Sequence, residues 1–306
     1  MTVKELKRIR VLAIVGIIIV FVLLILALGY GKETLKVYFF DVGQGDASLL
    51  VFPGNIQVLI DGGPDRGILR KVGRAMPFYD HKIEYVILTH PHSDHLTGVV
   101  DALDRYNVST FISNGVSRDD LPPYQKLTTL IKDKNIRTVV IDYPSALEIG
   151  GGRIEFLYPD HKLDGEERTD FNTGSVVLRV VYGESEFLFT GDMPRSVEDR
   201  LIEKGVDVSS DVLKVAHQGS KTSSGETFIS EVHPDYAVIM VGENTYGHPH
   251  TRTLLTLERK KIRVIRTDKA GDIVFNTDGR LLKLKGNPII EAFSRLHLKK
   301  FLTVLE

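Results

Sequence analysis

The chain of 306 residues contains no cysteine. Thiolate metal ligands, a thiol nucleophile and disulfide bonds are therefore all excluded. This absence fits a location outside the cytoplasm but does not require one. An excess of basic charge is also missing, because 39 lysines and arginines stand against 40 aspartates and glutamates, which gives a net charge of −1. The composition thus carries no general signal for nucleic-acid binding, although it does not exclude a local basic patch.

Charged side chains are missing from residues 11–28, which form an uninterrupted apolar run of eighteen residues. A helix rises about 1.5 Å per residue, so a run of this length just spans the hydrocarbon core of a bilayer. The segment before the run is basic, and basic flanks stay on the cytoplasmic side. We therefore expect a cytoplasmic flank over 1–10 and a single transmembrane anchor over 11–30. The rest of the chain would lie outside the cytoplasmic membrane.

A cleaved signal peptide is the alternative to this anchor. Ala27-Leu28-Gly29 has the small-x-small pattern of a cleavage site, and the mature chain would then be secreted. The apolar run is long for the hydrophobic part of a signal peptide, which favours the anchor.

The ten histidines of the chain are unevenly placed, because three of them fall within six residues. Residues 89–95 read Thr-His-Pro-His-Ser-Asp-His and directly follow the apolar run 85–88, which has the length and branching of a buried strand. If the chain stays extended through the proline, the first two histidines point the same way. The Asp-His pair then turns away, so that one loop addresses two adjacent metal positions. Imidazole and carboxylate ligands suit zinc, iron or manganese.

Polar residues also follow three later apolar strands. Asp192 follows the strand expected over 185–189, His217 follows 212–216, and His248 lies beyond 236–241. If these turns were unrelated, we would not expect a potential metal ligand to follow each strand. Because functional side chains collect at strand ends in layered α/β folds, we expect these exits to converge with residues 89–95 on one metal site.

Three further groups of residues are ambiguous from the residues alone. Asp41 and Asp46 flank a glycine-rich turn and Asp61 closes the next strand, and taken alone all three are turn formers. Residues 220–223 form either a polar rim suited to phosphate oxygens or a solvated loop. Three aromatic residues either stack nucleic-acid bases near the site or belong to the core: Phe78, Tyr79 and Tyr246.

In combination, these motifs resemble the metallo-β-lactamase fold superfamily and, more narrowly, the hydrolase domain of ComEC/Rec2-type competence proteins. The motifs are, in chain order, Asp41-Val-Gly-Gln-Gly-Asp46, Leu88-Thr-His-Pro-His-Ser-Asp-His95, Phe189-Thr-Gly-Asp192, His217-Gln-Gly-Ser220 and Asn244-Thr-Tyr-Gly-His248-Pro249. The resemblance covers about residues 35–280. It implies an α/β fold, a four-layer αββα sandwich over 31–286, which we expect to be followed by an amphipathic tail over 287–306.

The resemblance also implies two divalent metal ions, zinc or manganese, and assigns roles to residues of this chain. The metal ligands would be His90, His92, Asp94, His95, Asp192 and His217. Asp94, Asp192 and His248 would be catalytic: Asp192 bridges the ions and orients a hydroxide held between them, and His248 donates a proton or orients a ligand. The substrate side would be formed by Asp41, Gln44, Asp46, Asn172, Gln218, Ser220 and Lys221.

The chain departs from the pattern of this family at two positions. The wider superfamily has one more histidine before the bridging aspartate, and here Asn172-Thr-Gly-Ser stands in that region. This departure argues against lactam or thioester hydrolysis, and it leaves one metal with fewer nitrogen ligands, which favours manganese or weaker occupancy. Gln218 stands where the ComEC branch often has a second histidine. Glutamine can hydrogen-bond a substrate oxygen but cannot serve as a general acid.

We therefore expect a binuclear metal-dependent phosphodiesterase or nuclease that acts on DNA outside the cytoplasmic membrane. The alternatives are hydrolysis of another phosphodiester, such as phosphorylcholine on a cell-wall polymer or a nucleotide, a lactamase or lactonase, and a non-catalytic DNA-binding module. The multi-span channel region of ComEC proteins is absent from the sequence. Transport of DNA would therefore need a separate DNA-uptake channel protein as a partner.

Overall fold

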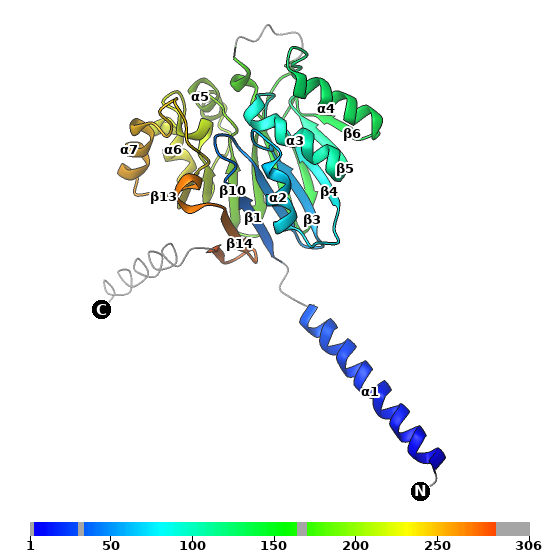
Figure 1. Cartoon of the computed structure of the whole chain (residues 1–306). Coiled ribbons are helices and arrows are strands. Elements are labelled where there is room, and N and C mark those ends of the chain that lie inside the picture. Colours follow the sequence, from blue (N-terminus) through cyan, green and yellow to red (C-terminus); the bar gives the residue numbers. More distant parts are fainter. Residues whose placement is uncertain (1–2, 30–33, 164–169, 286–306) are drawn as a thin grey trace, which may run out of the picture. The chain divides into compact units, whose positions relative to one another are not determined.

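The computed structural model describes residues 3–29, 34–163 and 170–285 (Figure 1). The chain divides into two compact units, residues 1–33 and residues 34–306. The first unit contains helix α1 (Val3–Gly29). Among the described residues, no helix is found that is both long and apolar enough to cross a membrane. The anchor over 11–30 stays a prediction, and the amphipathic tail over 287–306 lies outside the described residues.

The second unit contains two β-sheets. The first has eight strands in the order β15-β14-β1-β2-β3-β4-β5-β6. Their bounds are β1 (Leu35–Phe39), β2 (Ser48–Phe52), β3 (Ile56–Ile60), β4 (Lys82–Ile87), β5 (Asn107–Ser113), β6 (Arg137–Val140), β14 (Ile273–Thr277) and β15 (Leu282–Lys285). Strands β3 to β6 are parallel and the other neighbours are antiparallel. The parallel half places the carboxyl ends of β3, β4 and β5 at one edge.

The second sheet has seven strands in the order β13-β12-β11-β10-β9-β8-β7. Their bounds are β7 (Ser145–Ile149), β8 (Gly152–Tyr158), β9 (Val177–Tyr182), β10 (Ser185–Phe189), β11 (Val212–Lys214), β12 (Tyr236–Ile239) and β13 (Arg263–Arg266). Strands β10 to β13 run parallel. The exits of β10, β11 and β12 therefore lie side by side, which is the condition for their loops to share one site.

Helices cover the outer face of each sheet. Figure 1 shows α2, α3 and α4 beside β3 to β5, and α5, α6 and α7 beside β10 and β13. The helical bounds are α2 (Gly67–Ala75), α3 (Ser93–Arg105), α4 (Pro122–Asp133), α5 (Arg195–Glu203), α6 (Glu226–Val232), α7 (Thr251–Arg259) and α8 (Thr267–Ala270), with 3-10 turns η1 (Phe171–Gly174) and η2 (Ala216–Gly219). One apolar cluster lies between the sheets and one under each helical layer. The predicted four-layer αββα sandwich is confirmed.

Strand β2 shows how one strand contributes to two of the three cores. All five of its residues are buried. Leu50 and Phe52 belong to the cluster between the sheets, whereas Leu49 and Val51 belong to the cluster under α2, α3 and α4. Successive side chains of a strand point to opposite faces, so a strand buried on both faces reads as a continuous apolar run.

Phe39 anchors the inner core directly beneath the strand that leads to the predicted bridging aspartate. Its ring stacks on that of Phe189, the last residue of β10, with 5.4 Å between centroids, and meets Phe275 edge-on. We predict that Phe39→Ala lowers the free energy of unfolding by about 3–5 kcal/mol, because the cavity left in a close-packed core is not refilled. Urea unfolding followed by circular dichroism measures the change. Leu255→Ala, at a position 49% exposed on α7, should change it by no more than about 0.5 kcal/mol, and an equal loss in both variants would contradict the assignment.

Candidate metal centre

The histidine-rich segment connects strand β4 to helix α3. His92 is the N-cap of α3 in an extended conformation, so the chain stays extended up to this residue and then coils. Asp94 and His95 consequently lie in the first helical turn. A carboxylate there is favoured by the unpaired backbone N–H groups of the helix start. The extended part and the helical part thus present their side chains from different directions.

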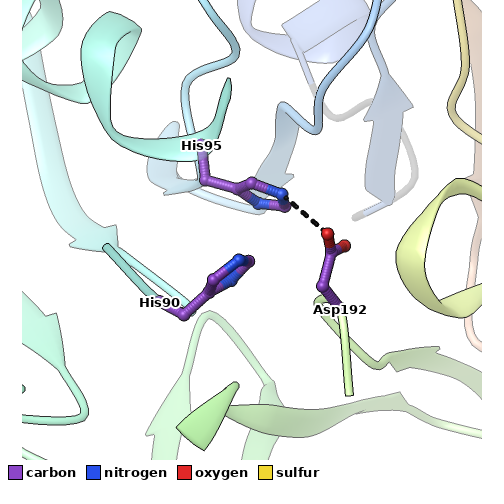
Figure 2. A group of neighbouring side chains, drawn as sticks. All are labelled: His90, His95 and Asp192. Carbon is purple, nitrogen blue, oxygen red and sulfur yellow. Dashed lines mark ion pairs between the residues drawn. The ribbon is translucent and has the colours of Figure 1, made fainter. Parts of the chain in front are cut away.

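Three buried side chains form the centre of the site, as Figure 2 shows. His90 and His95 are inaccessible to solvent and Asp192, which follows β10, is 2% exposed. His95 Nε2 lies 3.4 Å from Asp192 Oδ2, and each residue offers a ligand atom within 4.8 Å of those of the other two. Among the described residues, His95 Nε2 and Asp192 Oδ1 are buried polar atoms that have no hydrogen-bond partner. Unsatisfied nitrogen and oxygen donors in such a group fit a divalent metal ion.

The other three predicted ligands join this centre through short contacts. His92 Nδ1 lies 3.1 Å from His90 Nε2, Asp94 Oδ2 lies 3.7 Å from His95 Nε2, and His217 Nε2 lies 3.7 Å from Asp192 Oδ2. His217 follows β11 in a left-handed conformation with φ of 49°, which turns its side chain back toward Asp192. The structure therefore brings all six predicted ligands together at the exits of β4, β10 and β11.

Asp61 orients one of these ligands, a role that the sequence reading did not assign. Its carboxylate accepts hydrogen bonds from the backbone N–H and hydroxyl of Thr89, each at 2.8 Å, and from His95 Nδ1 at 2.9 Å. A carboxylate can only accept, so Nδ1 carries the proton and Nε2 is left to face Asp192. The available signal was a strand-end aspartate before two glycines, which also describes an ordinary turn.

The charges of the site are strongly coupled. Burial disfavours a charged His95, but Asp192, Asp94 and Asp61 outweigh it and raise its pKa well above the ordinary value. Burial also opposes ionisation of Asp192, and the neighbouring His95 and Lys214 hold the pKa of that carboxyl well below its usual range. Burial and His95 lower the pKa of His90. Without metal, the site is therefore a protonated imidazole beside an ionised carboxylate, with a neutral histidine next to them.

Two residues that were predicted to bind substrate, Gln44 and Gln218, form a chain of hydrogen bonds to the predicted ligand Asp94. Gln218 Nε2 donates to Asp94 Oδ2 at 3.0 Å. Gln44 Nε2 in turn donates to Gln218 Oε1, and Gln44 Oε1 accepts from the backbone N–H of Gly242 at 3.2 Å. This chain of bonds fixes the Asp94 carboxylate, because each amide is oriented by the next partner. Gln218 thus acts on the ligand side of the site.

The remaining predicted substrate residues lie at different depths. Asn172 in η1 is buried, and its Oδ1 has no hydrogen-bond partner within the described part of the chain. Ser220 is buried with its hydroxyl 3.0 Å from that of Thr222, whereas Lys221 is exposed. Asp41 is half-buried and accepts from the backbone N–H of Gly43. Asn172 therefore offers an acceptor that no described residue uses.

His248 lies next to His217, with 5.3 Å between ring centroids. Asn244 clamps its backbone, because the amide of Asn244 donates to His248 O at 2.9 Å and accepts from His248 N at 3.0 Å. The ring atom Nδ1 is buried and has no hydrogen-bond partner among the described residues. Burial and the neighbouring His217 lower the pKa of His248, so its ring is neutral at pH 7.

The aromatic residues suggested for base stacking fall into two places. Tyr246 is 75% exposed and its ring lies 5.9 Å from that of His248. Phe78 and Tyr79, by contrast, precede β4, whereas the histidine-rich segment follows it. A strand of six residues separates its two ends by roughly 20 Å. The suggestion that Phe78 and Tyr79 lie near the site is therefore wrong.

Two cations near the site were missed from the sequence. Lys214, the last residue of β11, is 2% exposed and lies among the carboxylates of the site. The Arg118 guanidinium stacks 4.3 Å from the ring centroid of Phe171, and that ring lies 5.7 Å from the ring of His92. In sequence, Lys214 is embedded in an apolar strand and Arg118 in a polar loop, so neither position points to a site.

The αββα architecture and the candidate ligands are typical of metal-dependent hydrolases, and comparison with known proteins supports this class. A model of the metallo-beta-lactamase superfamily matches residues 40–243, and the chain belongs to this superfamily. It is 29% identical over 260 residues to ComE operon protein 3 of Bacillus subtilis, covering 79% of this chain and 33% of that protein. It is 30% identical over 241 residues to Competence protein ComA of Neisseria gonorrhoeae, covering 77% of this chain and 31% of that protein.

These matches confirm the resemblance drawn from the motifs. The chain spans about a third of the length of these curated relatives. Among solved structures it is similar to Igni18, described as a novel metallo hydrolase from the archaeon Ignicoccus hospitalis, with 14% identity and a TM-score of 0.53. That match covers 79% of this chain and 98% of the other, and it shows the fold alone.

The protonated state of His95 predicts that metal binding releases protons. Its folded pKa is raised above the ordinary 6.5, so at pH 7 a metal ion must displace the proton from Nε2. We expect release of about one proton per bound metal at this position and an affinity that increases with pH. Isothermal titration of the metal-free protein with Zn²⁺ or Mn²⁺ in buffers of different ionisation enthalpy measures the release.

The exposed His233, in the left-handed C-cap of α6, provides a matched control. His233→Asn should leave proton release unchanged, whereas His95→Gln should abolish it. Binding heats that do not depend on the buffer would contradict the assigned protonation. By linkage, the His95 proton stabilises the metal-free fold fully below pH 6.5, and this contribution disappears as the pH rises through the folded pKa.

Proposed function

We propose that the chain is a binuclear metal-dependent phosphodiesterase that cleaves nucleic acid. The observation that carries the proposal is the convergence of the six predicted ligand side chains at the exits of β4, β10 and β11, where His95 Nε2 and His217 Nε2 both face Asp192 Oδ2. His90, His92, Asp94, His95, Asp192 and His217 would hold two divalent ions, zinc or manganese. When bound, such ions polarise a phosphoryl oxygen and acidify water.

The residues of the chain supply the positioning for this chemistry. Asp61 holds the tautomer of His95, and the Gln44–Gln218 pair fixes Asp94. The neutral His248 ring lies beside His217, where it would orient that ligand or donate a proton to a leaving oxygen of the substrate. Pre-oriented groups of this kind lower a barrier because they need no rearrangement during the reaction.

An anionic diester fits the charges at the mouth of this site better than a neutral acyl substrate does. The Arg118 guanidinium donates to both carboxylate oxygens of Asp120 and lies over the ring of Phe171, which is next to His92. The exposed Lys221 lies in the loop after His217. Cations bind phosphate oxygens through charge-assisted hydrogen bonds. The exposed Tyr246 ring beside His248 offers a stacking surface for a base, which favours nucleic acid among the phosphodiesters.

The names of the relatives also support DNA as the substrate. One of them is called a competence protein, and the chain matches only about a third of its length. We further propose a DNA-uptake channel protein as a partner of this chain.

Cleavage assays test the proposed reaction. We predict that the full chain, loaded with Mn²⁺ or Zn²⁺, cleaves single- or double-stranded DNA and bis-p-nitrophenyl phosphate but not nitrocefin. Asp192→Ala should lower both activities by about 100-fold or more, because it removes a ligand between the two sheets. Glu258→Ala, an exposed carboxylate on α7, should retain them. Cleavage of the small diester alone would move the substrate to a nucleotide or a wall polymer, and a metal-loaded protein without phosphodiester cleavage would contradict the proposal.

We further propose that residues 11–30 anchor the chain in the cytoplasmic membrane with the hydrolase domain outside. The uncharged run after a basic flank supports this, as do the exposed apolar side chains of α1 between Leu12 and Val22. The protein should sediment with membranes, resist extraction by high salt and be released by detergent. Added protease should cut the domain in spheroplasts. A soluble chain in the medium that begins near residue 30 would instead establish a cleaved signal.

A further inference from the structure

An ammonium group lies in the same buried pocket as the predicted bridging carboxylate. Lys214 and Asp46 are 2% and 3% exposed, and Lys214 Nζ forms an ion pair with Asp46 Oδ2. The same Nζ donates to the carbonyl of Gly191 at 2.7 Å and lies 3.7 Å from Asp192 Oδ1. Lysine is almost never fully buried unless it is paired, because transfer of its charge from water is costly. The burial of Lys214 therefore indicates a specific function for its ammonium group.

The cavity beside this ammonium is too small to admit a substrate. The cavity lined by Lys214, Asp46, Asp61 and Thr89 has a volume of about 10 Å³, which holds about one water molecule. The polar contacts of Nζ are with the carbonyl of Gly191, Asp46 Oδ2 and Asp192 Oδ1. The contacts of Lys214 thus point inward, toward the groups that carry the ligands.

The contacts of Lys214 set the orientation of Asp192. Oδ1 faces the ammonium, whereas Oδ2 faces His95 at 3.4 Å and His217 at 3.7 Å. The preceding Gly191, whose carbonyl Lys214 holds, adopts a left-handed φ of 50° in a tight space, where an added Cβ would meet Ser175 at 3.0 Å. Lys214 therefore fixes both the backbone and the charge of the residue that presents Oδ2.

The Lys214–Asp46 pair also connects the two halves of the ligand set. Lys214 belongs to β11 in the seven-stranded sheet, and Asp46 belongs to the loop between β1 and β2 in the eight-stranded sheet. Asp46 is itself attached to the histidine-rich segment, because its backbone N–H donates to the carbonyl of Asp94 at 3.3 Å. The pair is thus a bridge beneath the site between the loops that hold Asp94 and Asp192.

We propose that Lys214, paired with Asp46, is a positioning residue for the metal centre. It holds Asp192 with Oδ2 toward the other ligands and ties the ligand loops of the two sheets together before metal arrives. The inference rests on the proposed metal-dependent function, but its test measures metal binding and needs no substrate. Absence of phosphodiester cleavage would therefore leave it standing, and normal metal binding without Lys214 would overturn it alone.

The test compares metal binding in Lys214→Met and in the wild-type chain. Methionine keeps an unbranched apolar stem and removes the ammonium. We expect competition with a chelating dye to show an affinity for Zn²⁺ or Mn²⁺ that is about 10–100-fold weaker, the range for loss of a group that orients a ligand. The visible absorption bands of the Co²⁺-loaded protein should also shift, because the carboxylate of Asp192 reorients.

Lys134 provides a matched control. Its Nζ donates to the carbonyls of Leu103 and Asp104, so it is a lysine that caps a helix end far from any ligand. Lys134→Met should leave both the Co²⁺ bands and the affinity unchanged. Removal of a positive charge by itself would strengthen cation binding, so an unchanged or tighter affinity in folded Lys214→Met would overturn the proposal.

A second variant keeps the test decisive if Lys214→Met does not fold. Removal of one partner leaves Asp46 as an uncompensated buried charge, whereas removal of both partners is far less costly. Asp46→Asn combined with Lys214→Met should therefore fold. Weak metal binding and shifted Co²⁺ bands in this folded double variant would support the positioning role, and wild-type affinity with unshifted bands would overturn it.

Discussion

The contact between His95 and Asp192 is the interaction on which the site depends. His95 belongs to the helix that follows β4 in one sheet, and Asp192 follows β10 in the other. The two sheets pack face to face through a continuous apolar core, which holds these strand ends close together. A buried imidazole and a buried carboxylate are each costly alone, so the two groups stabilise each other or share a metal ion.

Most polar contacts around this pair orient a ligand. Asp61 fixes the ring of His95, Gln218 fixes Asp94, and Lys214 lies beside Asp192. Asp61 follows β3 of the eight-stranded sheet, whereas Lys214 ends β11 of the seven-stranded sheet and Gln218 lies in the turn after it, so the ligands are held from both sheets. Such an arrangement keeps the donors in place in the metal-free protein, which reduces the ordering that metal binding must bring about.

The sequence predicted the fold and the convergence of the six candidate ligands because short local motifs indicate both. The histidine-rich segment combines several ligand types in one turn, and Asp192 and His217 each follow an apolar strand. Lys214 was missed because, in the sequence, a lysine within a short apolar run is indistinguishable from a strand residue whose side chain reaches solvent. The partners of Gln218 depend on a loop 174 residues away, so its role could not be read from its neighbours. Phe78 was misplaced because it is close to His90 in the sequence, although the whole length of β4 separates the two residues in the structure.

Anomalous X-ray diffraction from crystals of the protein grown with Mn²⁺ or Zn²⁺ tests the central claim most directly. The account predicts two anomalous peaks roughly 3.5–4 Å apart, with the carboxylate of Asp192 between them. His90 and His92 should contact one peak, and Asp94, His95 and His217 the other. Peaks elsewhere on the protein, with the space between His95 and Asp192 empty of metal, would contradict it.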